Sequence, residues 1–203
     1  MTTILGIKYN NGVLLASDMQ ATYSHIRFSR ERKIYPITRS IAVATAGMVG
    51  DLQTIVKQLK VEATLYELNN KKPISPKALT NFLSLLLNSL ARHLFYQGPL
   101  VEFIVGGYGE GPELYSVDAA GGTSEHEDFT ALGSGIELAL SYLEAHYRPD
   151  IDERAAVALA VGALQNTIKR EIFTGFEPFI CIIDSSGYRE IRENEIREIL
   201  GQG

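Results

Sequence analysis

The sequence predicts an α+β fold in which two stacked antiparallel β-sheets lie between two helical layers, a four-layer αββα sandwich. Three observations support this prediction. The expected elements come in groups along the chain: strands, two helices, strands, two helices, strands. Tight turns join successive strands, which makes those strands antiparallel neighbours. Paired helices between strand groups cannot build an alternating parallel sheet, so each pair is expected to cover one outer face. No repeat or linker divides residues 1–203, which we expect to form one domain.

The first group of strands consists of two predicted hairpins. Residues 3–9 and 13–17 are apolar segments separated by an Asn-Asn-Gly sequence, and asparagine and glycine tolerate the positive φ angles of a tight turn. Residues 33–37 and 41–46 form the second pair of strands. The segment between the two hairpins is expected to be a loop.

Two helices are predicted next. From residue 51 onward, apolar side chains recur every three to four residues, which is the period of an amphipathic helix. These side chains are Leu52, Ile55, Val56, Leu59, Ala63 and Leu68. A second helix is expected to begin at Ser75-Pro76, because serine caps helices well and proline fits the first helical position. Its apolar stripe comprises Leu79, Phe82, Leu83, Leu86, Leu90 and Leu94.

The second half of the chain follows the same order. The expected elements are strands at residues 101–106, 113–118 and 129–132, helices at 136–147 and from 152 to about 173, strands at 179–183 and 188–191, and a short polar helix at the end. The apolar stripe predicted for the longer of these helices includes Ala155, Leu159 and Ile168. Both outer helical layers of the sandwich are thereby accounted for.

Composition excludes several classes of function. The net charge is −5, whereas a dedicated binder of nucleic acid or of an anionic membrane surface carries a basic face. The longest apolar stretches are far too short to span a bilayer. Lys8 and the following Asn-Asn pair interrupt the region where a signal peptide needs an unbroken apolar segment, and a single cysteine fits a reducing compartment. We therefore expect a cytoplasmic protein that binds neither nucleic acid nor membrane.

The sequence shows no motif for metal or cofactor chemistry. The four histidines lie far apart and have no metal-ligand spacing. The glycine-rich segment Gly106-Gly107-Tyr108-Gly109 is expected to be a turn between two strands and not a phosphate-binding loop. Cys181 stands in a run of apolar residues, which favours a buried, inert thiol over a nucleophile. We expect no cofactor and no metal.

The start of the chain carries the one pattern with catalytic potential. Thr2 follows Met1, and initiator methionine is normally removed when a small residue comes next. Removal would leave a hydroxyl and a free α-amine on the same residue. An α-amine, with an ordinary pKa of roughly 8, can act as the base that activates the hydroxyl. Many proteins begin with Met-Thr, so this pattern alone is weak evidence. If Met1 is retained, an amide replaces the amine and the chemistry is lost.

Six further segments strengthen this interpretation. They are residues 2–7, 12–18, 33–35, 45–51, 118–122 and 133–135, and they span nearly the whole chain. In order and spacing these segments resemble the β subunits of the 20S proteasome, in particular the archaeal type. The members of this family are threonine proteases and N-terminal nucleophile hydrolases. The fold that the resemblance implies is the αββα sandwich described above.

The resemblance also implies a catalytic site. Thr2 would be the nucleophile of a threonine endopeptidase, and Asp18 and Lys33 would complete its central triad. The positive charge of Lys33 would help to withdraw the hydroxyl proton, and Asp18 would fix Lys33 in place. The backbone N–H of Gly47 would stabilise the oxyanion. Ser134 matches a serine that supports the terminal amine.

The sequence departs from the family at several positions. Glu171 and Thr174 stand where the family usually has aspartate and serine, and both would support the catalytic amine. Glutamate keeps the charge but is one methylene longer, so whether its carboxylate reaches the amine stays open. The segment between Asp18 and Lys33 is one residue short, and Gln20 stands where arginine is common.

The resemblance implies a substrate-binding surface as well. The backbone of an extended peptide would pair with Thr22 and Gly47. The side-chain pocket would be lined by Ala21, Glu31, Tyr35, Thr45, Val49 and Gln53. Small residues at three of these positions leave room for a large substrate side chain, and the carboxylate of Glu31 would favour a basic one. We hypothesise cleavage after hydrophobic or basic residues.

Partners and alternatives follow from the same resemblance. The implied partners are identical or related β subunits in a seven-membered ring, α-subunit rings outside it, an ATP-dependent unfoldase and unfolded polypeptide substrates. Two functions stay open: a threonine endopeptidase, or a catalytically silent β-type subunit that assembles with an active β partner. A subunit like the bacterial protease HslV is a further alternative, although the chain is long for that family. A proteasome α subunit is disfavoured, because we find no helical extension before the first strand.

Overall fold

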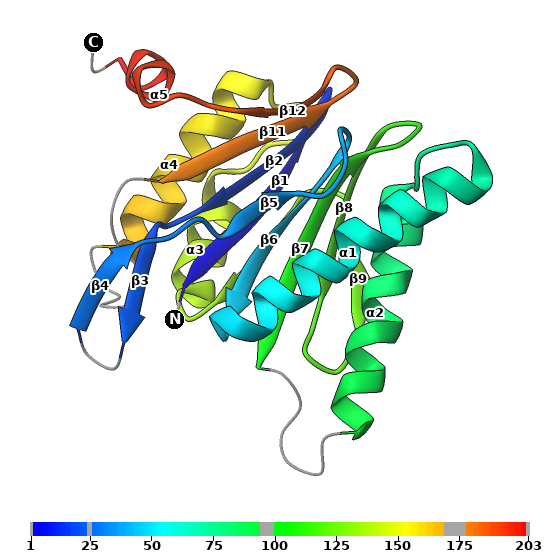
Figure 1. Ribbon diagram of the computed structural model, residues 1–203. Helices are drawn as coiled ribbons and strands as arrows, with labels where there is room; N and C mark the ends of the chain where they lie inside the picture. The colour runs from blue at the N-terminus through cyan, green and yellow to red at the C-terminus, as the bar shows by residue number, and fades with distance from the viewer. Residues whose placement is uncertain (1, 24–25, 94–99, 169–177, 202–203) are drawn as a thin grey trace.

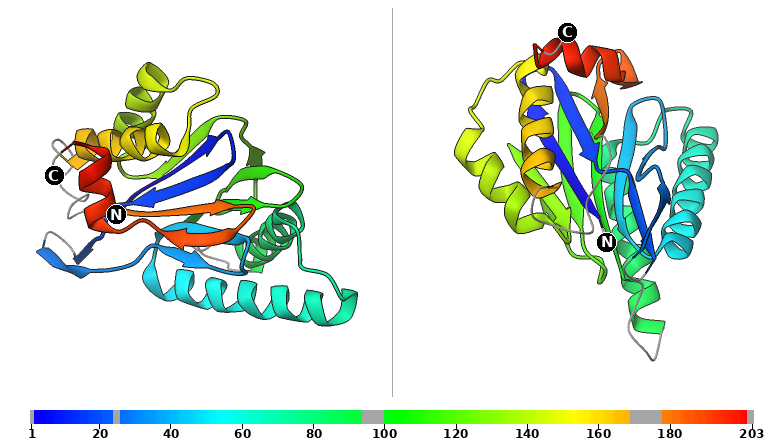
Figure 2. Two further views of the ribbon diagram at one scale, coloured as in Figure 1. Left: turned by 90° about the horizontal axis from the view of Figure 1, so that it is seen from above. Right: turned by 90° about the vertical axis from the view of Figure 1, so that its left-hand side faces the viewer.

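The computed structural model describes residues 2–23, 26–93, 100–168 and 178–201. Two five-stranded antiparallel sheets stack on each other, and a two-stranded hairpin lies apart from them (Figure 1). Helices cover the outer face of each large sheet, and the edge-on views of Figure 2 show the resulting order of helix, sheet, sheet and helix. The predicted α+β fold with αββα layers is confirmed.

The first sheet has the strand order β10-β1-β2-β11-β12. Its strands are β1 (Thr3–Tyr9), β2 (Gly12–Ser17), β10 (Phe129–Gly133), β11 (Phe179–Asp184) and β12 (Gly187–Glu190). Within this sheet, Thr3 lies opposite Gly133. The pairing brings the beginning of β1 next to the end of β10, although these residues are far apart in the sequence.

The second sheet has the strand order β5-β6-β7-β8-β9. Its strands are β5 (Ile34–Pro36), β6 (Ile41–Gly47), β7 (Val101–Tyr108), β8 (Pro112–Val117) and β9 (Thr123–Glu125). Gly47 lies opposite Val101, so the end of β6 adjoins the beginning of β7. In Figure 1 this end of the second sheet lies close to the N-terminus of the chain.

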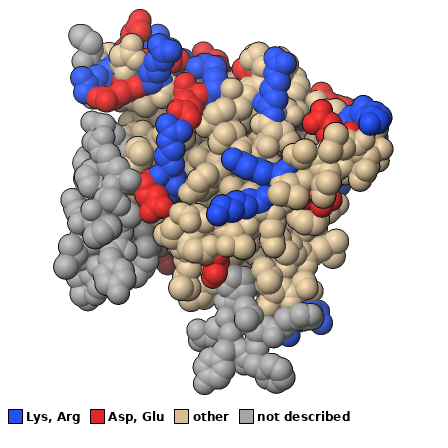
Figure 3. Space-filling model, viewed as in Figure 1, with Lys and Arg blue, Asp and Glu red and all other residues tan. Residues whose placement is uncertain are grey.

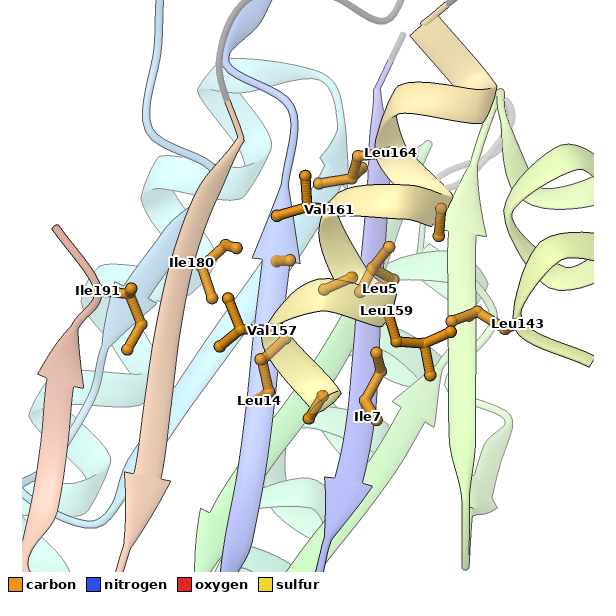
Figure 4. Close-up of a cluster of buried hydrophobic side chains, with 14 of the residues drawn as sticks. Leu5, Ile7, Leu14, Leu143, Val157, Leu159, Val161, Leu164, Ile180 and Ile191 are labelled. Carbon is orange, nitrogen blue, oxygen red and sulfur yellow. The ribbon is translucent and has the colours of Figure 1, made fainter. Parts of the chain in front are cut away.

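The helical layers bury the outward-facing side chains of each sheet. Helices α1 (Val49–Asn70) and α2 (Pro76–His93) pack on the second sheet, and α3 (Ile136–His146) and α4 (Glu153–Ile168) pack on the first. In Figure 4, Leu5, Ile7 and Leu14 of the first sheet lie against Val157 and Val161 of α4. A short helix, α5 (Glu193–Ile199), closes the chain as predicted. No helix in the described part of the chain is long and apolar enough to cross a membrane.

A third core lies between the two sheets. Ile4, Val13 and Leu15 of the first sheet belong to it, whereas their neighbours in sequence face α4, as expected from the two-residue period of a strand. Gly106 belongs to β7, as the predicted strand at 101–106 requires, whereas Gly107 and Tyr108, which were expected in the turn, extend that strand. A Cβ on Gly106 would lie 2.9 Å from the side chain of Val13, so glycine is required for the close approach of the sheets.

Other differences from the predicted elements are local. The segment expected to be a loop contains the hairpin of β3 (Gln20–Tyr23) and β4 (Ile26–Arg30), with an irregular register between positions 21 and 22. Leu68 is 59% exposed, because the C-terminal end of α1 extends past the sheet (Figure 1). Ala155 is also exposed, and the buried face of α4 begins one residue later, at Ala156.

Candidate active site

Thr2 lies immediately before β1 and is held by the turn that follows β10. The Ser134 backbone N–H donates a hydrogen bond to the Thr2 carbonyl oxygen at 2.8 Å, and the Ser134 hydroxyl donates a long one of 3.4 Å to the same oxygen. Gly133 has a φ angle of +94°, and a Cβ at this position would collide with the Thr2 carbonyl group. The Gly133-Ser134 turn therefore fixes the backbone of Thr2, and glycine is needed for the contact.

A buried ion pair anchors the same end of β1. Lys33 Nζ donates a hydrogen bond to Asp18 Oδ1 at 2.7 Å; the Asp18 side chain is fully buried and that of Lys33 is 9% exposed. Asp18 also accepts hydrogen bonds from the backbone N–H groups of Thr3, at 2.9 Å, and Gln20, at 3.0 Å. One carboxylate thus fixes both an ammonium group and the backbone next to Thr2.

Lys33 is held in turn by the second sheet. Thr45 of β6 donates two hydrogen bonds to the Lys33 carbonyl oxygen, from its backbone N–H at 2.8 Å and from its hydroxyl at 3.1 Å. Thr45 is itself 1% exposed. The ammonium group of Lys33 is therefore tied to the first sheet through Asp18, while its backbone is tied to the second. This arrangement restricts both ends of the lysine side chain.

A cavity of about 100 Å³ lies where these elements meet. Thr2, Lys33 and Gly47 line it together. Gly47 ends β6 with a φ angle of +134°, and a Cβ on it would collide with the carbonyl oxygen of Leu100. The chain can turn from β6 into α1 at this point only because position 47 is glycine. A hydroxyl, an ammonium group and an accessible stretch of backbone thus share one cavity.

Further side chains give this cavity its chemical character. Glu31, Tyr35 and Val49 line it, and so does Arg32. The Arg32 guanidinium forms an ion pair with Glu190 at 2.8 Å, which draws its charge toward β12. Burial, and to a smaller extent the charge of Glu31, raises the pKa of Tyr35, so its hydroxyl stays protonated at neutral pH. Among the described residues that line the cavity, Glu31 thus supplies a carboxylate and Tyr35 a neutral hydroxyl.

A second cavity, of about 330 Å³, is also lined by Thr2. Thr2 and Gly47 line both cavities, whereas Ser134, Glu102 and Ala119 line only the second. Thr2 is therefore positioned between two spaces. An extended chain that crosses Thr2 can place one side chain in each cavity.

Comparison with known proteins identifies the family. A family model described as proteasome subunit matches residues 1–183. The chain belongs to the proteasome subunit family. It is 41% identical over 202 residues to proteasome subunit beta 2 of Pyrococcus abyssi, which covers 99% of this chain and 95% of the relative.

Other relatives give the same result. Proteasome subunit beta 1 of Thermococcus kodakarensis is 41% identical over 200 residues, which are 98% of this chain and 96% of the relative. Proteasome subunit beta of Methanospirillum hungatei is 39% identical over 197 residues, which are 96% and 92% of the two chains. The protein is thus a β subunit of the 20S core particle and assembles with other proteasome subunits. Such subunits are, in general, threonine peptidases.

Several residues predicted for the site of this proteasome β subunit cannot be placed at the first cavity. Glu171 and Thr174 lie outside the described residues. Positions 21 and 22 belong to strand β3, where only the backbone of these two residues is described, and Ala21 and Thr22 are not among the residues described at the cavity. Gln53 is exposed on α1 and is likewise not among them. The roles suggested for these residues remain predictions.

The structure also adds residues to the predicted pocket. Gln20 and Leu52 line the first cavity, and Glu102 lines the second. Gln20 is the first residue of β3, and its backbone N–H donates a hydrogen bond to Asp18, so recognising β3 in the sequence would have drawn attention to this position. Leu52 follows Val49 by three residues on α1, which puts both on one helix face. Glu102 is found only through its pairing with Ala46 across β6 and β7.

Other nucleophiles and metal sites find no support in the described residues. Cys181 is fully buried between the sheets, and burial raises its pKa far above its ordinary value. Such a thiol is unreactive. No group of three or more histidine, cysteine, aspartate or glutamate side chains in the described ranges could hold a metal ion.

Proposed function

We propose that this proteasome β subunit is an active threonine endopeptidase whose nucleophile is Thr2 after removal of Met1. The buried Asp18–Lys33 ion pair, which lines the Thr2 cavity through Lys33, carries the proposal. Burying two charges costs several kcal/mol per ion in desolvation, which the attraction between them only partly offsets. A subunit with a purely architectural role has no need for this arrangement. The pair is therefore better explained by chemistry than by stability.

The proposed reaction uses the groups around the first cavity. The Thr2 hydroxyl attacks the carbonyl carbon of the scissile peptide bond while the Thr2 α-amine takes up the hydroxyl proton. The positive charge of Lys33 favours proton loss from the hydroxyl and disfavours prior protonation of the amine. The backbone N–H of Gly47 donates a hydrogen bond to the developing oxyanion.

The second half of the reaction reverses these proton transfers. The protonated amine gives its proton to the leaving nitrogen, the C–N bond breaks, and an ester to Thr2 forms. Water then attacks the ester while the amine takes up a proton from it; the ester C–O bond breaks, the amine returns the proton to the Thr2 oxygen, and the acid product leaves. Ser134 holds the Thr2 carbonyl group throughout, and Glu171 and Thr174 are proposed to orient the amine. We also propose that residues 1–203 form one domain.

We further propose that the first cavity binds the residue before the scissile bond, and that hydrophobic or basic residues are preferred there. Tyr35, Thr45 and Val49 offer apolar surface, and Glu31 offers a carboxylate. The backbone of the peptide would pair with Gly47 and with Thr22 of β3. A panel of fluorogenic peptides tests this specificity, and cleavage restricted to acidic residues would refute it.

The proposed setting is a cytoplasmic barrel. In this proposal β subunits form a seven-membered ring between α-subunit rings, and an ATP-dependent unfoldase supplies unfolded polypeptides. Enclosure would allow an enzyme with broad specificity to coexist with folded proteins. Gel filtration and electron microscopy of the chain co-produced with α subunits would test this stoichiometry.

A catalytically silent β-type subunit is the second candidate. It is favoured by one observation: glutamate at position 171 and threonine at position 174 replace the usual supporting aspartate and serine. Peptide hydrolysis by the assembled particle distinguishes the two functions. If the chain is active, Thr2→Ala abolishes hydrolysis, and Thr2→Ser, which keeps the hydroxyl, retains part of it. Equal hydrolysis by wild type and Thr2→Ala would show that another subunit performs the reaction.

A further inference from the structure

The second cavity contains a single charged side chain among the described residues that line it. That side chain is Glu102; its described neighbours in the cavity are uncharged, and most are apolar or small. The Lys33–Asp18 pair does not line this cavity in the described part of the chain. The volume of about 330 Å³ is large enough for one long side chain. The cavity therefore combines an apolar wall with one carboxylate.

The orientation of the Glu102 carboxylate is fixed by the scaffold. Glu102 stands near the beginning of β7, opposite Ala46 of β6, and is half-buried. Its Oε2 atom accepts a hydrogen bond from the Gly133 backbone N–H at 3.1 Å. A carboxylate has about four acceptor sites, so this hydrogen bond leaves capacity for a cationic donor. Because the anchor lies on paired strands, the carboxylate is held in place before a ligand arrives.

The position of the cavity relative to Thr2 suggests the ligand. Thr2 and Gly47 are common to both cavities, which therefore meet at the proposed nucleophile. A substrate that places the residue before the scissile bond in the first cavity directs the following residue toward the second. The face shown in Figure 3 carries exposed charges of both signs. Selection at this position depends on the local carboxylate.

We propose that the second cavity binds the residue after the scissile bond, and that Glu102 makes lysine or arginine the preferred residue there. This inference rests on the proposed function, because it needs Thr2 to act as the nucleophile. An ion pair in a partly exposed cavity, with one or two hydrogen bonds, gives a preference of roughly three- to tenfold in kcat/KM over an uncharged side chain. The preference decreases at high salt, because the cavity is open to solvent.

Internally quenched peptides that differ only in the residue after the scissile bond test this inference. The assembled wild-type particle should show a kcat/KM ratio of about three to ten for lysine over glutamine at that position. In Glu102→Gln the ratio should fall to about one, since glutamine can still accept the Gly133 hydrogen bond but lacks the charge. Ala119→Lys should lower the ratio too, because it adds a cation to the cavity without altering that hydrogen bond. Glu110→Gln is the matched control: it removes a carboxylate from the turn at the opposite end of β7 and should leave the ratio unchanged.

Peptides with an aminocoumarin leaving group have no residue after the scissile bond and report the threonine peptidase reaction alone. Hydrolysis of these peptides, combined with a lysine-to-glutamine ratio that is one in wild type or unchanged in Glu102→Gln, would overturn the inference and leave the proposed function intact. A uniform loss of rate in Glu102→Gln with an unchanged ratio would also overturn it, because Glu102 would then only support the Gly133 turn. Failure to hydrolyse either kind of peptide would refute the proposed function and this inference with it.

Discussion

Asp18→Asn removes a fully buried negative charge while nearly preserving the shape of the side chain. The carboxylate accepts hydrogen bonds of 2.7 Å from Lys33 Nζ, 2.9 Å from Thr3 N–H and 3.0 Å from Gln20 N–H. An asparagine amide replaces one acceptor oxygen by a donor, so at least one of these hydrogen bonds becomes a donor–donor contact. The buried ammonium of Lys33 also loses its counter-charge. Breaking a buried pair in this way lowers the free energy of unfolding by about 3–5 kcal/mol.

A double mutant separates the cost of the isolated charge from other effects. Lys33→Met removes the ammonium, and the combination with Asp18→Asn leaves no charge buried at this site. Replacing both members of a buried pair by uncharged groups is often close to neutral. We therefore expect the double mutant to be more stable than Asp18→Asn alone by about 2 kcal/mol or more. Activity should not recover, and both variants should lose roughly 10²- to 10⁴-fold in kcat.

Urea unfolding at one fixed protomer concentration measures these effects. Far-ultraviolet circular dichroism and tyrosine fluorescence are suitable probes, because the chain has ten tyrosines and no tryptophan. The matched control is Glu127→Gln, which removes a carboxylate from an exposed ion pair with Lys8 and should leave the unfolding curve unchanged. Additive destabilisation in the double mutant, or recovery of peptide hydrolysis without the ion pair, would refute the reasoning about Asp18 and Lys33.

Three further predictions concern other parts of the chain. Cys181 should resist alkylation in the native particle and react fully in denaturant, because burial raises its pKa; rapid native labelling, followed by mass spectrometry, would contradict its burial. Burial lowers the pKa of His126 from its ordinary value of 6.5, with Asp128 opposing this in part. The unfolded state then binds the proton more tightly, so the contribution of His126 to stability is complete above pH 6.5 and is lost as the pH falls toward the lower folded pKa. His126→Gln should therefore reduce the loss of urea midpoint between neutral and mildly acidic pH, and an identical pH slope in the variant would count against this prediction. Gly47→Ala should lower peptide hydrolysis at least tenfold and destabilise the chain by about 1–3 kcal/mol, because its φ of +134° is strained for alanine; wild-type melting temperature and activity would disprove it.

Local patterns predicted most of the fold. The turn at positions 10–12 and the Ser75-Pro76 helix start are short-range signals, and the corresponding elements lie where they were expected. The β3–β4 hairpin was missed because it pairs only with itself and carries a register irregularity, so its side chains do not alternate cleanly. The predicted strand at 101–106 ended two residues too early, and the close approach of Gly106 to Val13 of the opposite sheet is a contact that no local pattern reports.

In the candidate site too, residues marked by a sequence pattern were predicted, whereas residues that meet only in the folded chain were not. Position in a family pattern pointed to Thr2, Asp18 and Lys33, and the structure brings the last two into one buried ion pair. The family pattern gave no indication of Glu102. This residue reaches the site through cross-strand pairing with Ala46 and a hydrogen bond from the Gly133 backbone N–H. Residues that meet only through sheet register and the stacking of two sheets cannot be found from sequence spacing alone.

The central claim is that Thr2 acts through a hydroxyl and a free α-amine of its own. Intact-mass spectrometry of the chain from an assembled, peptide-hydrolysing particle, before and after treatment with a covalent inhibitor directed at N-terminal threonine, tests it most directly. We predict a chain that lacks Met1 and gains one inhibitor adduct on Thr2, with no adduct in Thr2→Ala. A chain that retains Met1, or one that lacks it but takes up no inhibitor while the particle hydrolyses peptides, would contradict the claim and leave this subunit an architectural role.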